Sequence, residues 1–264
     1  MKATKQKFNI VKYITNISLP WLLFTLLVFS LLVKLGFWQS ARADEKRQRL
    51  IRIEQLAKND ALSLAQVLTL ADKHNNKVSK NINDLPIEFT GELDDHYVFL
   101  LDNQANKNSL GYRVFQLVRA KQGALLVNLG WIIGSINRQE FPVFSVKSGK
   151  YKIKGNVRIM EKGVVLQEQQ FTEVTWPLRV QQIEVDKLSE LIGEKLLPFV
   201  VYLDKNEQLG FAKNWHPVVM PPEKHQAYAF QWFSLATAWL LLMAWASYKN
   251  SATHKNNKGH KNEQ

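Results

Sequence analysis

The pattern of hydrophobic and polar positions contains two long apolar segments, one near each end of the chain. Residues 18–33 and residues 227–248 contain no charged side chain. A helix of about 20 apolar residues crosses the hydrocarbon core of a bilayer. Apolar residues occupy every face of both segments, which favours membrane spans over the alternative of two buried core helices. The sequence therefore predicts transmembrane helices over residues 17–38 and 225–248.

The region between the two segments has a different pattern, which predicts an α+β domain. Apolar residues recur at three-residue spacing over residues 44–56, so we expect the first membrane helix to continue outward, as a solvated stalk or as a binding surface. From residue 85 onward, short β-rich runs are separated by turn signals. The expected strands cover residues 97–101, 111–120, 124–133, 151–159, 174–185 and 199–203. A short helix is expected over residues 186–196, with Asp186 as its N-cap.

Two turn signals set the expected ends of strands. Asp102 and Asn103 follow the first run and are expected to end it. Residues 121–123, Lys-Gln-Gly, separate two strand-like runs and predict a β-hairpin. The fold class is therefore a membrane α+β protein, in which a hairpin of two transmembrane helices brackets a mainly antiparallel β domain with short helices.

Charge places these parts relative to a membrane. The chain has a net charge of +12, and much of the basic excess lies toward its two ends. Basic residues follow the first span closely, which makes that span ambiguous by the positive-inside rule, but four Lys residues follow the second span. Two spans put both termini on one side, so we expect cytoplasmic termini and a periplasmic domain. The high pI reflects these tails and needs no nucleic-acid partner.

The chain is thus expected to have five parts. They are a cytoplasmic N-terminal tail (1–16), the first transmembrane helix (17–38), an extracytoplasmic, periplasmic α+β domain (39–224), the second transmembrane helix (225–248) and a basic cytoplasmic tail (249–264). Residues 251–264 are rich in Asn and Lys and are expected to be disordered. The first apolar run is longer than the roughly 7–15 residues of the apolar h-region of a signal peptide, which favours an uncleaved anchor. The N-terminal tail carries Lys but no Arg, which favours a bacterial inner membrane over a mitochondrial transit peptide.

Several kinds of chemistry lack their sequence signals. The chain has no cysteine, which excludes a disulfide framework, a thiolate metal site and haem attached through Cys-x-x-Cys-His. It has no Walker loop, no G-x-G-x-x-G, no G-x-S-x-G and no H-E-x-x-H motif. We therefore predict no copper, zinc or nucleotide site and no enzymatic activity, and the alternative of a membrane-tethered hydrolase lacks a nucleophile motif.

A first candidate cluster lies where the first span ends. Trp38, Arg42 and Lys46 are four residues apart and share one face of a continuous helix. Cations at this position could meet the carboxylates of a bound haem at the membrane interface. The plainer alternative is an interfacial Trp with flanking cations that extend toward water.

A second cluster lies where the second span begins. His225, Tyr228 and Trp232 share a helix face, with Gln231 beside it. An imidazole that enters a membrane helix is costly if it faces lipid. A neutral imidazole nitrogen can ligate haem iron, and an aromatic wall suits the macrocycle. The alternative is a hydrated interfacial histidine.

The two clusters, and the segments between them, resemble the Surfeit locus protein 1 family of assembly factors for cytochrome c oxidase. That family has a G-x-W-Q…R…K signature after its first span and an H-x-x-Y-A-x-Q-W-F signature entering its second. The matching residues here are Gly36, Trp38, Gln39, Arg42, Lys46, His225, Tyr228, Ala229, Gln231, Trp232 and Phe233. Between them, Gly91, Leu101 to Asn103, Gly111 to Val114 and Val127 to Trp131 follow the family's order, so the resemblance covers about residues 19–248.

The resemblance implies a non-enzymatic protein that binds haem a at the outer ends of its membrane helices and aids its insertion into the oxidase. The implied site has His225 as the axial ligand of the haem iron, Tyr228, Gln231 and Trp232 beside it, and Trp38, Gln39 and Arg42 as the opposing wall. His216 or Met220 could supply a sixth ligand. The implied partners are the catalytic subunit of cytochrome c oxidase, the haem a synthesis enzyme and membrane lipid.

Two points qualify this expectation. Leu129 occupies a position where the family usually has Arg, so any contact that the Arg makes is absent here or is supplied elsewhere. The alternative function is a membrane adaptor that stabilises the oxidase core subunit during assembly without binding haem.

Overall fold

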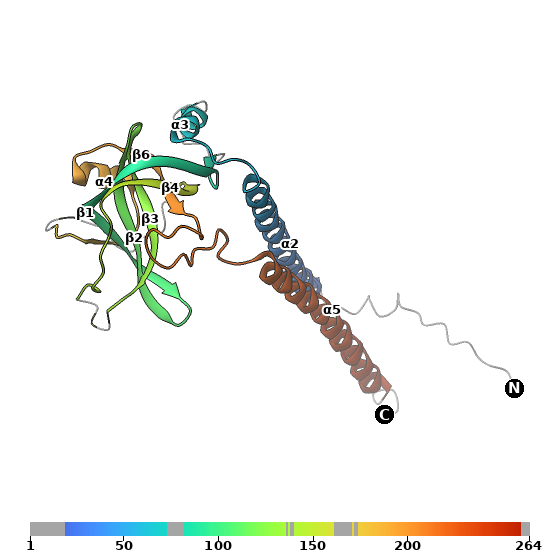
Figure 1. Cartoon of the computed structure of the whole chain (residues 1–264). Helices are drawn as coiled ribbons and strands as arrows, with labels where there is room; N and C mark the ends of the chain where they lie inside the picture. Colours follow the sequence, from blue (N-terminus) through green and yellow to red (C-terminus); the bar gives the residue numbers. More distant parts are fainter. Residues whose placement is uncertain are drawn as a thin grey trace. The chain divides into compact units, whose positions relative to one another are not determined.

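The computed structural model describes residues 19–72, 82–135, 137, 140–160, 171 and 174–259, and the side chains of these residues up to 249. Two compact units make up the chain: residues 1–50 together with 218–264, and residues 51–217 (Figure 1). The predicted N-terminal tail, residues 1–16, lies outside the described residues, as do residues 260–264.

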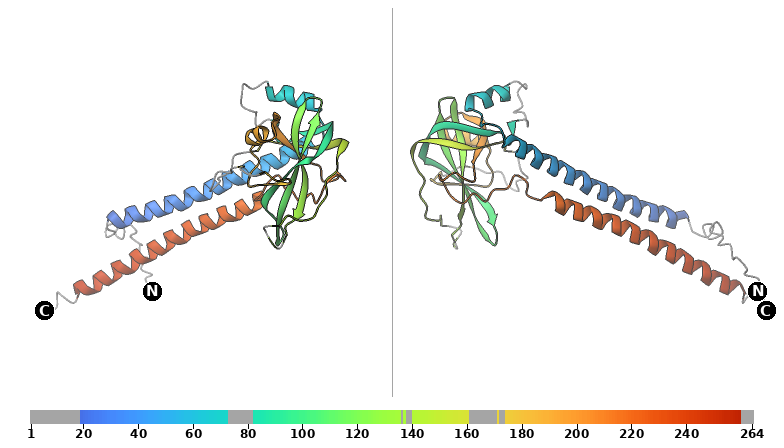
Figure 2. Two further views of the ribbon diagram at one scale, coloured as in Figure 1. Left: turned by 90° about the vertical axis from the view of Figure 1, so that its left-hand side faces the viewer. Right: turned by 45° about the vertical axis from the view of Figure 1, so that its right-hand side comes forward.

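Two long helices form the first unit. Helix α2 spans Leu19–Leu56 and helix α5 spans Pro222–Gly259, and they run side by side (Figure 2). Each is long and apolar enough to cross a membrane, and only 6% and 11% of their most apolar windows are buried. That exposure distinguishes them from the core helices of a soluble protein, and together with their apolar length it indicates a membrane-anchored protein.

The ends of these helices confirm one prediction and correct another. Helix α2 continues to Leu56, as the spacing of apolar residues over 44–56 predicts. Helix α5 begins with Pro222, whose fixed φ suits the first helical position, and it continues to Gly259. The prediction that residues 251–259 are disordered was wrong. No Pro or Gly interrupts the chain before Gly259, so each added residue gains a backbone hydrogen bond on a helix that has already formed.

The second unit is built on one mixed sheet that closes into a barrel (Figure 1). Its strands are β1 (Pro86–Asn106), β2 (Ser109–Ala120), β3 (Gly123–Ile133), β4 (Gly149–Arg158), β5 (Leu178–Val180) and β6 (Leu196–Leu203). Their order is β2-β3-β6-β4-β1-β5, and the additional pairing of β1 with β2 closes the barrel.

Strand direction was predicted only in part. The pairings β1–β2, β2–β3, β1–β4 and β4–β6 are antiparallel, as expected, but β3–β6 and β1–β5 are parallel. Alternation of apolar and polar residues reveals which face of a strand is buried, and it carries no information about the direction of the neighbouring strand. The two parallel pairings therefore could not be read from the pattern.

Of the two predicted turns, the one at residues 121–123 is present and the one at Asp102 and Asn103 is not. The hairpin at residues 121–123 joins β2 to β3 as predicted. Asp102 and Asn103 do not end a strand, because β1 continues through them to Asn106. Asn103 has a φ of +57°, and the register of β1 against β2 shifts between Leu101 and Gln104. The turn-forming pair thus makes a bulge inside a long strand. The strand predicted over residues 174–185 is reduced to the three residues of β5.

Two short helices belong to the barrel unit. Helix α4 spans Val185–Ile192, so the predicted helix at 186–196 is shorter, and Glu184, rather than Asp186, is its N-cap residue. Gly193 ends the helix in the left-handed conformation, with a φ of +68°. Helix α3 spans Leu64–Asp72 and was not predicted. Its signal is a capping box, because the backbone N–H of Ser63 donates to Gln66 Oε1 over 2.8 Å.

The core of the barrel unit has two layers. The interior of the barrel is filled by aliphatic and aromatic side chains that include Leu100, Val114, Leu125, Val127, Phe199 and Val201. A second cluster on the outer face packs against α4 and includes Phe99, Phe115, Leu126, Leu188 and Val200. Successive residues of β2, β3 and β6 alternate between the two layers, as the pleat of a strand requires.

Candidate functional site

A seam of small residues lets the two long helices approach closely. Gly36 and Ala43 are buried on α2, and Ala229 and Ala236 are buried on α5. Each pair is separated by seven residues, which places its members on one face over two turns of helix. A Cβ atom added at Gly36 would lie 2.6 Å from the ring of Phe233. Small residues at the contact are typical of helix pairs that pack within a membrane.

Three contacts show that the helices are antiparallel. Gln39, midway along α2, contacts His225 in the first turn of α5. Phe37 packs edge to face on Phe233, with ring centroids 5.3 Å apart. Deeper along the pair, the indole N–H of Trp239 donates to the backbone carbonyl of Thr25 over 3.2 Å.

The contact between His225 and Gln39 is the centre of the candidate site. His225 Nδ1 lies 2.8 Å from Gln39 Oε1, and both side chains are half-buried. The two residues are 186 positions apart in sequence. The predicted axial ligand and one predicted wall residue are therefore direct neighbours across the seam.

The remaining predicted residues are distributed around this contact. At about 100° of rotation per residue, Phe37 and Phe233 lie on one flank of the seam. Gln39, Arg42, His225, Tyr228 and Trp232 lie on the other flank, whereas Trp38 and Gln231 turn about 160° away from the seam on their own helices. Tyr228 is 43% exposed and Trp38 is 54% exposed, so neither is covered by the rest of the helix unit.

Charged side chains continue the same flank of α2. Arg42 Nη1 lies 2.5 Å from Glu45 Oε2, and Lys46 Nζ lies 3.9 Å from Glu45 Oε1. The predicted cation Arg42 thus forms an ion pair with Glu45, which the sequence analysis did not predict. The three-residue spacing of opposite charges on a helix was the signal that could have predicted it.

The proposed sixth ligands fall in different units. Met220 belongs to the helix unit and is 36% exposed, whereas His216 belongs to the barrel unit. Among the described residues, no group of three or more His, Asp or Glu side chains could hold a metal ion. His225 is thus not part of such a group among the described residues.

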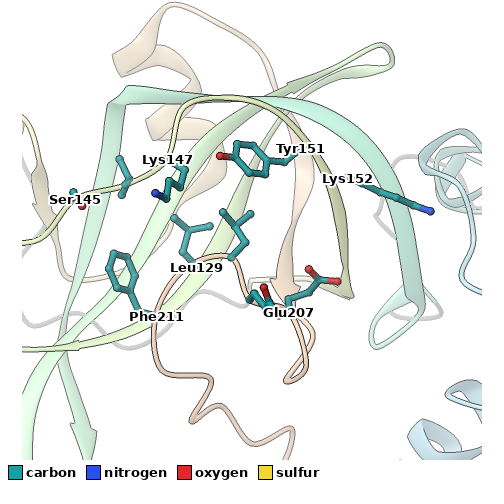
Figure 3. Close-up of a pocket in the computed structure, with 11 residues that line it drawn as sticks. Leu129, Ser145, Lys147, Tyr151, Lys152, Glu207 and Phe211 are labelled. Carbon is teal, nitrogen blue, oxygen red and sulfur yellow. The ribbon is translucent and has the colours of Figure 1, made fainter.

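A separate cavity lies in the barrel unit (Figure 3). It has a volume of about 390 Å³, and its lining includes Leu129, Lys147, Tyr151 and Phe211. The side chain of Lys152, at its edge, points away from the cavity. None of the predicted haem-site residues lines it. Leu129 is only 1% exposed, so the position at which the resemblance leads us to expect Arg is part of the barrel core.

The motif residues on the barrel have local structural contacts. Asn128 Oδ1 accepts the backbone N–H of Gly130 over 2.8 Å. Gly130 has a φ of +118°, and a Cβ atom there would lie 2.8 Å from the carbonyl oxygen of Ala212. The indole N–H of Trp131 donates to the carbonyl of Gln104 over 2.8 Å. These contacts hold the end of β3 against the backbone at Ala212 and against β1.

A family comparison now decides the assignment. A model of the SURF1 family matches residues 26–237, which include both helix-end motifs and the whole barrel unit. The chain belongs to the SURF1 family. Among curated proteins, no match is found. SURF1 proteins are associated with the membrane and with assembly of cytochrome c oxidase, and SURF1 is an assembly-factor family, not a known enzyme family.

Membership in SURF1 confirms the resemblance that the motifs indicate, and it places Gln39 and His225 inside the matched region. The small seam residues were missed by sequence reasoning as a group. Their seven-residue spacing on both helices was the signal that could have found them.

Proposed function

We propose that this SURF1 protein binds haem a on the flank of its helix pair and aids insertion of that haem into the catalytic subunit of cytochrome c oxidase. The observation that carries the proposal is the contact of His225 with Gln39, which holds one imidazole between the first turn of α5 and the middle of α2. The family's association with oxidase assembly supplies the process.

The residues of the flank fit this group. Bound haem a supplies an iron atom with four equatorial nitrogens, so the protein has to add only axial ligands. His225 offers one such ligand, and no competing metal cluster exists among the described residues. Tyr228 and Trp232 offer aromatic surface to a flat apolar ring. Arg42 offers a cation to a haem carboxylate once it leaves Glu45.

The proposal includes a membrane orientation. Four Lys residues follow the second apolar segment, which supports cytoplasmic termini and a periplasmic barrel unit in a bacterial inner membrane. The haem site then lies at the outer surface of the membrane, and the enzyme that makes haem a and the oxidase catalytic subunit are its partners.

The test is a visible absorption spectrum of the full chain purified in detergent from a host that makes haem a. We expect a haem band in the wild-type protein and its loss in His225→Ala. His96→Ala, which removes an exposed histidine from the barrel unit, is the matched control and should keep the band. A clean wild-type protein without haem contradicts the proposal, and a band that survives His225→Ala contradicts the ligand assignment.

A second candidate function is an adaptor that holds the oxidase core subunit without haem. Exposed aromatic side chains on both helices favour it, because Phe37 is 65% exposed and Phe230 is 74% exposed. Such side chains could pack on a helix of the partner within the bilayer. Co-purification of the oxidase catalytic subunit with haem-free His225→Ala at the wild-type level would support the adaptor, whereas loss of co-purification together with haem would support haem insertion.

A further inference from the structure

We propose that Gln39 is a positioning residue that selects the tautomer of His225, so that Nε2 is the atom presented to the haem iron. The inference rests on the proposed function for its purpose, but the tautomer itself is a property of the haem-free protein. It assigns Gln39 a role other than forming a wall of the site.

The orientation of the Gln39 amide sets the direction of the hydrogen bond, because its oxygen, and not its nitrogen, faces the ring. The oxygen of a glutamine amide only accepts, so the imidazole nitrogen that faces it has to donate. His225 Nδ1 is 2.8 Å from Gln39 Oε1, a good length for such a bond. A neutral imidazole has one N–H, and with that hydrogen on Nδ1 the lone pair lies on Nε2. A histidine that ligates a metal commonly donates its other ring N–H to an oxygen in this way.

The packing of the helices builds this contact. Gln39 lies between Gly36 and Ala43 on α2, and His225 lies one turn before Ala229 on α5. Because these three neighbours are small, the helix backbones come close enough for a short amide side chain to reach across the seam. Both partners are half-buried, so water competes less for the bond than it would on an exposed face.

The charged side chains on this part of α2 pair with one another, and Gln39 is the partner that hydrogen-bonds to His225. The carboxylate of Glu45 is held by Arg42 at 2.5 Å and by Lys46 at 3.9 Å. Within the described part of the chain, Gln39 is the one side chain that hydrogen-bonds to His225. Replacing the amide therefore changes the hydrogen-bond partner of the imidazole without removing a second one.

The first experiment measures the tautomer directly in the haem-free protein. The chain has six histidines, so the ¹⁵N signals of His225 in the detergent-solubilised protein are assigned by their absence from His225→Ala. We expect Nδ1 to carry the proton in the wild type and a mixture of tautomers in Gln39→Leu. The control is Gln48→Leu, the same substitution at an exposed position of the same helix. A wild-type protein that carries the proton on Nε2 overturns the inference, whatever its haem content.

The second experiment measures binding with haemin, iron protoporphyrin IX, as the probe. We expect Gln39→Leu to weaken haemin binding about 10- to 100-fold, in the range seen when such outer partners of a metal-bound histidine are removed. Gln39→Glu keeps an acceptor and should restore binding, and its carboxylate should raise the iron–histidine stretching frequency in the resonance Raman spectrum of the ferrous protein above the wild-type value. Gln48→Leu should bind as the wild type does.

The two possible failures are distinct. If the wild type binds no haemin, the proposed function fails, and the NMR result stands by itself. If the wild type binds haemin through His225 but Gln39→Leu keeps the wild-type affinity and stretching frequency, the proposed function stands and the role of Gln39 is wrong.

Discussion

Small side chains hold the helix pair together, whereas large ones hold the barrel. At the seam the buried residues are Thr25, Gly36, Ala43, Ala229 and Ala236. The largest fully buried side chains all belong to the barrel unit, and Phe99, Phe115 and Phe199 are the bulkiest of them. The helices instead expose their large apolar residues, which is the arrangement expected where lipid, and not water, surrounds a protein. Burial of large apolar groups therefore stabilises one unit, and close backbone packing stabilises the other.

The motif residues of the two units also differ in exposure: several on the helices face outward, and several on the barrel are bonded internally. Motif residues on the helices, such as Trp38, Tyr228 and Gln231, have exposed side chains that remain available to a ligand or partner. Motif residues on the barrel, such as Asn128 and Trp131, are engaged in internal hydrogen bonds. We therefore expect substitutions in the barrel motifs to lower stability first, and substitutions on the helix flank to lower binding first.

The largest effect is expected from truncating the barrel core. Phe199 is 1% exposed in the interior of the barrel, so Phe199→Ala should lower the free energy of unfolding of this unit by about 3–5 kcal/mol. The measurement is urea unfolding of the full chain in detergent, with hydrogen exchange of the barrel and helix peptides followed separately by mass spectrometry. Leu110→Ala, at a position 57% exposed, is the control. Equal acceleration of exchange in the helices would show that the two units do not unfold independently.

The next effect is expected at the helix seam. Gly36→Leu places a side chain where even a Cβ atom lies 2.6 Å from the ring of Phe233, which should destabilise the helix pairing by about 1–3 kcal/mol. Because the chain has no cysteine, Thr25→Cys and Trp239→Cys can be introduced as the only thiols, and their cross-linking by a bifunctional thiol reagent reports the pairing. We expect a lower yield with Gly36→Leu and recovery when Phe233→Ala restores the space. An unchanged yield would mean that the seam tolerates bulk.

A smaller effect is expected from a barrel motif residue. Trp131→Phe removes the indole N–H that donates to the carbonyl of Gln104, and it leaves that carbonyl without this partner. The expected loss is about 1–2 kcal/mol in the free energy of unfolding of the barrel. Haemin binding at the helix flank should be unchanged. A loss of haemin binding with unchanged barrel stability would reverse the division of roles between the two units.

Much of the fold could be predicted from periodicity, and the failures have physical reasons. The two long helices, the β2–β3 hairpin and β4 follow from local pattern. The parallel pairing of β3 with β6 joins strands far apart in sequence, so no local signal specifies it. Asp102 and Asn103 have the residue types of a turn, but pairing with β2 on both sides of them keeps β1 extended through a bulge.

The candidate site could be predicted as two clusters but not as one contact. His225 and Gln39 each lie in a recognisable segment, yet their contact depends on the relative depth of two helices, which neither segment specifies alone. The seven-residue spacing of small residues marks the face on which each helix packs, and it does not specify this depth. The ion pair of Arg42 with Glu45 could be predicted from α2 alone, because it depends only on a three-residue spacing.

The smallest effect is expected from an ion-pair network on the barrel surface. Arg119 bridges Asp94 and Glu194, with Nη2 2.9 Å from Glu194 Oε2. Burial alone would raise the pKa of Asp94, but hydrogen bonds from Arg119 and from the backbone amides of His96 and Tyr97 hold that pKa below its ordinary value. Arg119→Gln removes partly exposed ion pairs, so its cost at pH 7 should be below about 1 kcal/mol.

The pH dependence of this small cost tests its origin. A carboxylate whose pKa is lower in the folded state contributes stability above its unfolded pKa, about 3.9 for Asp, and loses that contribution as pH falls through the folded pKa. The difference in urea midpoint between the wild type and Arg119→Gln should therefore be constant near neutral pH and shrink below about pH 4. Lys121→Gln, which removes one exposed positive charge from the same unit, should show no such change. If the difference for Arg119→Gln stays constant down to pH 3, packing of the Arg119 side chain, and not its pairing with Asp94, stabilises this side of the barrel.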